Sequence, residues 1–239
     1  MPTIYFKNTI MKLLSVNVSP TKMVQINGQP VQTGIYKTPV QGCVWLGKLT
    51  LVGDSQADTS VHGGEHQAAY CYPLEHYAYW QYRLMMPNLA YGTFGENFTV
   101  TGLLEEDICI GDILQIGDAK TGAVVQVTMP RIPCFKFGHK IGHPDILNEF
   151  LSSGKSGFYL RVIQTGVVEA NDPISVIERD PQAISIRTTL GLQKLGEGDS
   201  ALLNRALKVQ SLAPLLKQIF EARLIEMRAQ MAKQNLVIF

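Results

Sequence analysis

Apolar and polar residues alternate in short runs along the first three quarters of the chain, which is the pattern of half-buried β-strands. Glycine, proline, asparagine or aspartate punctuates these runs, which lie at residues 13–18, 42–46, 67–72, 112–116, 124–128 and 157–164. Several short strands at such spacing favour a barrel or sandwich over alternating β-α-β units. We therefore expect a mainly β fold, a β-barrel with interspersed helices.

Helical spacing replaces this alternation at two places in the first part of the chain. Residues 73–84 open with Pro73, which suits a first helical turn, and carry Leu74, Tyr77 and Trp80 on one stripe. A shorter helix is predicted at residues 145–151, between a proline and a glycine.

Beyond about Val176 glycine and proline become rarer and helix-forming residues dominate. Three helices are predicted there, at residues 182–189, 201–209 and 213–231. We therefore divide the chain into a β-barrel domain, residues 1–176, and a small C-terminal three-helix domain, residues 177–239. A unit of about 60 residues buries little apolar surface by itself, so it should pack on the barrel or on a second subunit. The apolar end of this tail favours a homodimer.

Composition removes several classes of protein. The 239 residues carry 21 Lys and Arg against 20 Asp and Glu, a net charge of +1, which gives no support for a nucleic-acid or anionic-membrane partner. No apolar run approaches the ~20 residues that cross a bilayer, and no signal peptide is evident at the start. We expect a cytoplasmic protein with no membrane partner.

Four cysteines are spread over the chain without a CxxC pair, so we expect reduced thiols rather than a disulfide framework. Cys43 and Cys109 lie in strand-like runs and are expected in the core, whereas Cys71 can face either side of its strand. Cys134 differs, because Pro130 and Pro133 hold its segment extended and outside a regular strand ladder.

Positive side chains accompany Cys134 in the sequence. Arg131 and Lys136 lie three residues before it and two after it, and cations favour the thiolate form. A thiolate is a nucleophile or a soft ligand for a soft metal, and the Arg131 fork suits phosphate or carboxylate. The alternative is a buried and inert cysteine.

A second constellation lies at residues 61–66, where His62 and His66 flank Gly63 and Gly64. Two glycines make a poor helix, at roughly 1 kcal/mol each, so the helical HExxH zinc motif does not apply. A glycine pair instead exposes backbone N–H groups to an anion or heterocycle, and His62 lies beside it. A turn with a solvated histidine is the equally weighted alternative.

Three further polar residues are candidates with weaker support. Asn97 offers an amide donor and a carbonyl acceptor to a polar heterocycle, or it bonds its own backbone. Lys155 lies in the loop of residues 153–157, whose Gly-x-x-Gly spacing suits an anion but lacks the Walker pattern. Lys37, in the run of residues 33–37, is the third candidate for the site, and the alternative interpretation is an ordinary surface lysine.

Taken in order, these segments resemble the MOSC family, and most closely its YiiM-type bacterial branch. The resemblance rests on the joint order of the motifs at residues 34–37, 53–58, 62–68, 72–73, 95–98, 111–112, 130–134 and 154–157, together with the three-helix tail. It covers nearly the whole chain.

This resemblance implies a β-barrel core that binds molybdenum cofactor, a molybdopterin carrying a phosphate. Cys134 matches the family's metal-coordinating cysteine and would be both ligand and catalytic residue. His62 would pass a proton to the substrate. The other residues carried over as cofactor-binding are Lys37, Gly63, Gly64, Asn97, Arg131, Lys136 and Lys155.

The activity implied by the resemblance is reduction of small N-hydroxylated compounds, including N-hydroxylated purine bases such as 6-N-hydroxylaminopurine, which gives resistance to them. No flavin or iron–sulfur motif is evident in the sequence, so an external flavin or iron–sulfur reductase would supply electrons. Two alternatives stay open: a non-catalytic carrier of molybdenum cofactor or sulfur, and a zinc protein that uses His62, His66 and Cys71.

Overall fold

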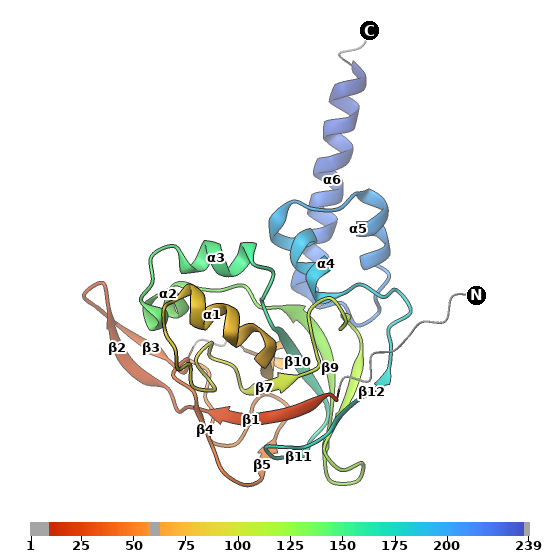
Figure 1. The fold of residues 1–239 in the computed structure, drawn as a ribbon. Helices are drawn as coiled ribbons and strands as arrows, with labels where there is room; N and C mark the ends of the chain where they lie inside the picture. Colours follow the sequence, from red (N-terminus) through yellow and green to blue (C-terminus); the bar gives the residue numbers. More distant parts are fainter. Residues whose placement is uncertain (1–9, 58–62, 237–239) are drawn as a thin grey trace.

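The computed structural model describes residues 10–57 and 63–236, with side chains up to residue 230. A sheet of eight strands in the order β12-β8-β9-β10-β6-β7-β1-β4 organises the molecule (Figure 1). Only β6 and β7 are parallel, and every other neighbouring pair is antiparallel. Two smaller sheets, β5 with β11 and β2 with β3, complete the β structure of the described residues.

The strands are β1 (Lys12–Val18), β2 (Lys22–Ile26), β3 (Gln29–Thr33), β4 (Thr38–Pro39), β5 (Val44–Leu46), β6 (Ala69–Pro73), β7 (Phe98–Thr101), β8 (Ile113–Ile116), β9 (Ala123–Pro130), β10 (Phe158–Gln164), β11 (Gly166–Val168) and β12 (Ile174–Glu178). The α-helices are α1 (Tyr77–Arg83), α2 (Phe135–Ile141), α3 (Ile146–Ser152), α4 (Ile186–Leu190), α5 (Ser200–Ala206) and α6 (Pro214–Leu236). Short 3₁₀ helices cover Glu65–Gln67 and Leu74–His76, and a π-helical turn covers Gly191–Leu195.

The large sheet is open, so the expected closed barrel is not confirmed. Its ends, β12 and β4, do not pair with each other. Near one end a single bridge joins Lys12 to Pro173, and the Leu13 N–H donates to the Asp172 carbonyl over 3.0 Å. The Ile174 N–H also donates to the Met11 carbonyl over 3.0 Å, but this contact is an isolated bridge and not a pairing of two strands. The fold is a mixed, sheet-dominated one with several helices.

Each of the six predicted apolar runs contains a strand, with ends that differ by a few residues. Strand β9 continues through Pro130 and pairs that residue with Phe158 of β10, so the expectation that Pro130 lies outside a strand ladder is wrong. Pattern reading missed β7, β11, β12 and the β2–β3 hairpin, although the Asn27-Gly28 turn of that hairpin is a typical signal. Both turn residues have positive φ, 52° and 75°.

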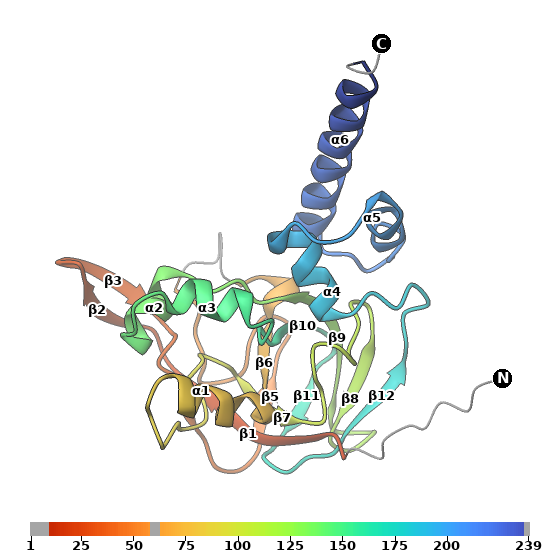
Figure 2. The ribbon, with the colours of Figure 1, turned by 45° about the horizontal axis from the view of Figure 1, so that its top comes forward.

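Helices α1, α2 and α3 enclose an aromatic cluster with β6, and Figure 2 shows the three grouped on one side of the molecule. Phe94 lies at its centre, fully buried, with its ring 4.4 Å from that of Tyr72 and 5.2 Å from that of Tyr77. The predicted helices at residues 73–84 and 145–151 correspond to α1 and α3. Helix α2 was not predicted.

The C-terminal helices pack through a second apolar cluster that includes Ile110, Met129 and Ile184 of the preceding chain. Leu216, Phe220 and Leu224 of α6, which corresponds to the predicted helix at residues 213–231, are buried there. Further along, α6 projects away from the sheet (Figure 1). The domain boundary near residue 176 stays a prediction. Within the described residues, no helix has the length and apolar character to cross a bilayer.

Three of the cysteines lie away from the cavity described below. The expectation of a core position is wrong for Cys43, which is exposed and donates to Glu169 over 3.2 Å, because it precedes β5 instead of lying in it. Cys71 faces the core and is 1% exposed. Cys109 is half-buried, and burial raises the pKa of its thiol to about 11.

Candidate functional site

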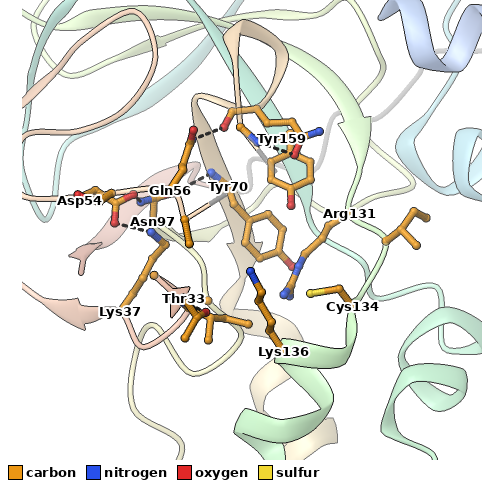
Figure 3. A pocket seen from close by; sticks show the side chains of 18 residues that line it. Thr33, Lys37, Asp54, Gln56, Tyr70, Asn97, Arg131, Cys134, Lys136 and Tyr159 are labelled. Atoms are coloured by element: carbon orange, nitrogen blue, oxygen red, sulfur yellow. Dashed lines mark hydrogen bonds and ion pairs between the residues drawn. The ribbon is translucent and has the colours of Figure 1, made fainter. Parts of the chain in front are cut away.

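A cavity of about 720 Å³, counted with the space at its mouth, opens between the β2–β3 hairpin, α2 and the large sheet. Figure 3 shows its side chains converging from both sides. Its charged lining consists of Lys37, Asp54, Arg131 and Lys136, and Cys134 supplies the sulfur. Among the lining residues that the structure describes, three cations against one carboxylate favour an anionic ligand.

Cys134 ends a four-residue connection between β9 and α2. Its backbone is extended, with φ −120° and ψ 172°, as Pro133 just before it predicted. The side chain belongs to none of the three apolar clusters and lines the cavity, where Figure 3 shows the sulfur pointing inward. The prediction that this cysteine follows a strand and lies outside the apolar core is confirmed, and the stiffness of the connection stays a prediction.

Arg131 is a buried cation, only 5% exposed, beside Cys134 in the cavity wall. Its Nη1 donates to the Phe94 carbonyl over 2.6 Å, and its guanidinium lies 4.8 Å from the Tyr70 ring centre and 4.7 Å from that of Phe137. These contacts fix the guanidinium plane. Arg131 therefore contributes a fixed positive charge to this wall, with one nitrogen already bonded to the protein.

Lys37 reaches the cavity from the segment between β3 and β4. Its Nζ donates to Asp54 Oδ1 over 2.5 Å, and its side chain is 9% exposed. Burial lowers the pKa of Lys37, and the neighbouring Asp54 carboxylate opposes that change. The lysine is a cavity group and not the ordinary surface residue of the alternative reading.

Asn97 lines the cavity but uses both ends of its amide within the protein. Its Oδ1 accepts from the Tyr70 N–H over 3.1 Å, and its Nδ2 donates to Asp54 Oδ2 over 2.9 Å and to the Asn17 carbonyl over 3.3 Å. An amide that is engaged in this way braces β6, β7 and Asp54. Asn97 therefore shapes the site, and its proposed contact with a cofactor stays a prediction.

Lys140 links α2 to two backbone segments near the cavity. It extends from α2 and donates to the Ile35 carbonyl over 2.9 Å and to the Gly92 carbonyl over 2.7 Å. Burial lowers the pKa of Lys140 to about 8, with Glu96 opposing. The Glu96 carboxylate is fully buried, and burial raises its pKa. Because α2 begins just after Cys134 and Ile35 lies two residues before Lys37, these bonds hold the Cys134 segment and the Lys37 segment in fixed positions relative to each other.

This lysine predicts a pH dependence of stability. The unfolded chain keeps the Lys140 proton to about pH 10.5 while the folded protein releases it near pH 8, so between these values unfolding takes up a proton and the free energy of unfolding rises with pH. We expect the difference in unfolding free energy between wild type and Lys140→Met to move in favour of wild type between pH 7.5 and 9.5. The expected change is on the order of 1–2 kcal/mol. Urea titrations at both pH values measure it, and a constant difference would contradict the assignment.

The other predicted site residues are distributed unevenly. Gly63 and Lys136 line the cavity, whereas Gly64 is not among its lining residues. His62 lies outside the described residues. Lys155 lies elsewhere, with its Nζ 5.1 Å from the Tyr79 ring. The loop of residues 153–157 contacts a carboxylate of the protein, because the Gly157 N–H donates to Glu105 over 2.6 Å.

Sequence reasoning missed several polar lining residues, among them Asp54, Gln56, Tyr70 and Tyr159. The signal for Asp54 was its place in the Gly-Asp-Ser-Gln run of residues 53–56. Tyr70 and Tyr159 lie on paired positions of β6 and β10, so their partnership follows from strand register. Alternation alone does not give that register.

A zinc site has no support among the residues that the structure describes. They contain no group of three His, Cys, Asp or Glu side chains placed to hold a metal ion. Cys71, one of the three ligands of that alternative, faces the apolar core. His66 is partly buried beside Arg161, and burial lowers its pKa.

The open mixed sheet and the cationic cavity that Cys134 lines are the features to compare with known protein families. The MOSC domain model matches residues 58–175, and the chain belongs to the MOSC domain family. The resemblance inferred from the sequence is confirmed.

Individual relatives support this assignment. The chain is 38% identical to the uncharacterized protein YflK of Bacillus subtilis over 73% of this chain and 77% of that protein. It is 33% identical to a protein named reductase from Gibberella moniliformis, over 70% of this chain but only 29% of that longer protein. Among solved structures, YiiM from Geobacillus stearothermophilus matches with a TM-score of 0.73 and 35% identity, covering 90% of this chain and 99% of that one.

Proposed function

We propose that this protein is a molybdenum-cofactor-dependent reductase of N-hydroxylated compounds, with N-hydroxylated purine bases such as 6-N-hydroxylaminopurine as substrates. The observation that carries the proposal is the Cys134 side chain, which lines a cavity whose other charged groups are mainly cations. The MOSC family and the reductase-named relative support the same class of function.

The residues present fit a molybdopterin. The cavity offers one soft sulfur donor, which suits molybdenum, and the cations Lys37, Arg131 and Lys136, which suit a phosphate. Gly63 lines the cavity and packs closely against Gln56, because a Cβ at this position would come 2.0 Å from the Gln56 side-chain oxygen. When bound, the cofactor supplies two-electron redox chemistry. Cys134 would hold the metal, and the cations would hold the phosphate.

The reaction consumes two electrons and two protons, cleaves the N–O bond of the substrate and releases an amine and water. The chain's residues bind the ligands, fix the Cys134 sulfur and limit water around it. We assign His62 as a proton donor on the sequence alone. We propose an external flavin or iron–sulfur protein as the partner that supplies the electrons. We also propose that the protein acts in the cytoplasm and forms a homodimer.

Turnover in two expression hosts tests this function. Protein is purified from a host that makes molybdopterin and from one blocked in pterin synthesis, and each sample is supplied with an artificial electron donor and 6-N-hydroxylaminopurine. We expect amine formation only with protein from the competent host. Equal activity from both hosts would rule out the proposal. Bound cofactor without turnover would instead support the alternative of a non-catalytic carrier.

A further inference from the structure

Asp54 holds a dense set of hydrogen bonds at the cavity wall, and its side chain is 1% exposed. One carboxylate oxygen, Oδ1, accepts from the Ser19 N–H over 3.0 Å and from Lys37 Nζ over 2.5 Å. The other, Oδ2, accepts from Asn97 Nδ2 over 2.9 Å and from Thr50 Oγ1 over 3.2 Å. Four donors saturate a carboxylate, so this group has a single orientation.

The four donors come from separate parts of the fold. Ser19 follows β1, Thr50 follows β5, and Asn97 precedes β7. Since these three donors are held by the sheet or by strand ends, the carboxylate that they fix directs the fourth donor, Lys37. Figure 3 shows Lys37, Asp54 and Asn97 joined on one side of the cavity, across from Cys134.

The electrostatic surroundings of Lys37 give Asp54 a second effect. Burial lowers the pKa of Lys37 and Arg131 lowers it further, whereas Asp54 and, more weakly, Glu96 raise it. Lys140 belongs to the same group of buried cations. Removal of the Asp54 charge would therefore let the buried ammonium lose its proton more readily.

We propose that Asp54 is a positioning residue, whose carboxylate keeps the Lys37 ammonium charged and fixed at the cavity wall so that it recognises the phosphate of a bound ligand. This role rests on the proposed function for its ligand, but the state of Lys37 is a property of the protein alone. Asp54 itself touches no reacting atom in this scheme.

Acetylation of Lys37 in the protein without cofactor tests the role of Asp54, because the reagent reacts with the neutral amine. Acetic anhydride is applied at pH 7.5, and peptide mass spectrometry gives the rate at each lysine. We expect Asp54→Asn to accelerate acetylation of Lys37 about tenfold, which corresponds to about one pKa unit. Acetylation of Lys140 should stay unchanged, which reports that the cavity wall is intact.

The matched control is Asp112→Asn. The Asp112 carboxylate is equally buried and accepts from the Cys109 N–H over 2.9 Å and from Arg179 over 2.6 Å, but it does not line the cavity. This variant should leave the Lys37 rate unchanged. If Asp54→Asn does not fold, Thr50→Val removes one of the four bonds and should accelerate Lys37 acetylation about twofold to threefold. An unchanged Lys37 rate in whichever variant folds would overturn the proposal.

Inorganic phosphate is the probe for the ligand. In wild type, phosphate should slow acetylation of Lys37 but not of Lys155, whereas in Asp54→Asn this protection should be lost. Absence of protection in wild type would overturn the assigned phosphate contact. A protein that passes both tests but takes up no molybdenum in a competent host would refute the proposed function and leave the role of Asp54 intact.

Discussion

We expect replacement of Cys134 by alanine to abolish reduction of N-hydroxylated bases while the thermal midpoint of unfolding barely changes. The sulfur is the soft donor of the cavity, and the carboxylate among its described lining residues, Asp54, already accepts four hydrogen bonds. The side chain lies outside the three apolar clusters, so its removal leaves no cavity in the core. Loss of the metal contact should reduce turnover by at least about two orders of magnitude, about 2.7 kcal/mol in transition-state free energy.

Cys109→Ala is the matched control for this prediction. Cys109 is half-buried like Cys134 but does not line the cavity. Turnover should be retained in this variant. Full activity of Cys134→Ala in a folded protein would contradict the assigned role of the sulfur, and a large fall in its thermal midpoint would show that the residue is structural.

The largest expected loss of stability follows from Phe94→Ala. The ring is fully buried and stacks on Tyr72, with Trp80 and Phe137 also in contact range at 6.1 and 6.4 Å between ring centres. Truncation of a buried phenylalanine costs about 3–5 kcal/mol. For a chain of this size, each kcal/mol lowers the thermal midpoint by about 2–4 °C. Calorimetry or thermal circular dichroism measures the shift.

The same variant also bears on the cavity, because the Phe94 backbone carbonyl accepts from Arg131. Phe135→Ala serves as the control, since that ring is 54% exposed on the first turn of α2 and should change the midpoint little. A Phe94→Ala midpoint equal to wild type would show that the aromatic cluster does not support this side of the fold.

The strands that carry the sheet were predictable because apolar alternation is strong in β8, β9 and β10. Helix α2 was not, since it follows Pro133 and contains Gly138, and a glycine in a helix interior costs roughly 1 kcal/mol. Its packing in the aromatic cluster compensates, and no local pattern reports such packing. The openness of the sheet depends on pairing between segments near residues 12 and 173, which local patterns do not report either.

The site also has a part that was predictable from the sequence and a part that was not. Cys134 and its cations were predictable because proline, arginine and lysine lie within five residues of it, and because the motif order matches a family. The hydrogen bonds that support the cavity wall were not predictable, since their partners are distant in sequence. Lys140 and the Ile35 carbonyl are 105 residues apart, and Asn97 and Asp54 are 43 apart. Only the folded chain shows that Asn97 is engaged internally and that Asp54 directs Lys37.

Elemental analysis with pterin fluorescence on freshly isolated protein tests the central claim most directly. Wild type and Cys134→Ala are purified in parallel from a host that makes molybdopterin. Wild type should carry molybdenum and pterin in nearly equal amounts approaching one per chain, and the variant should lose the metal. A folded wild-type protein with neither molybdenum nor pterin, or a variant that retains both in full, would contradict the account.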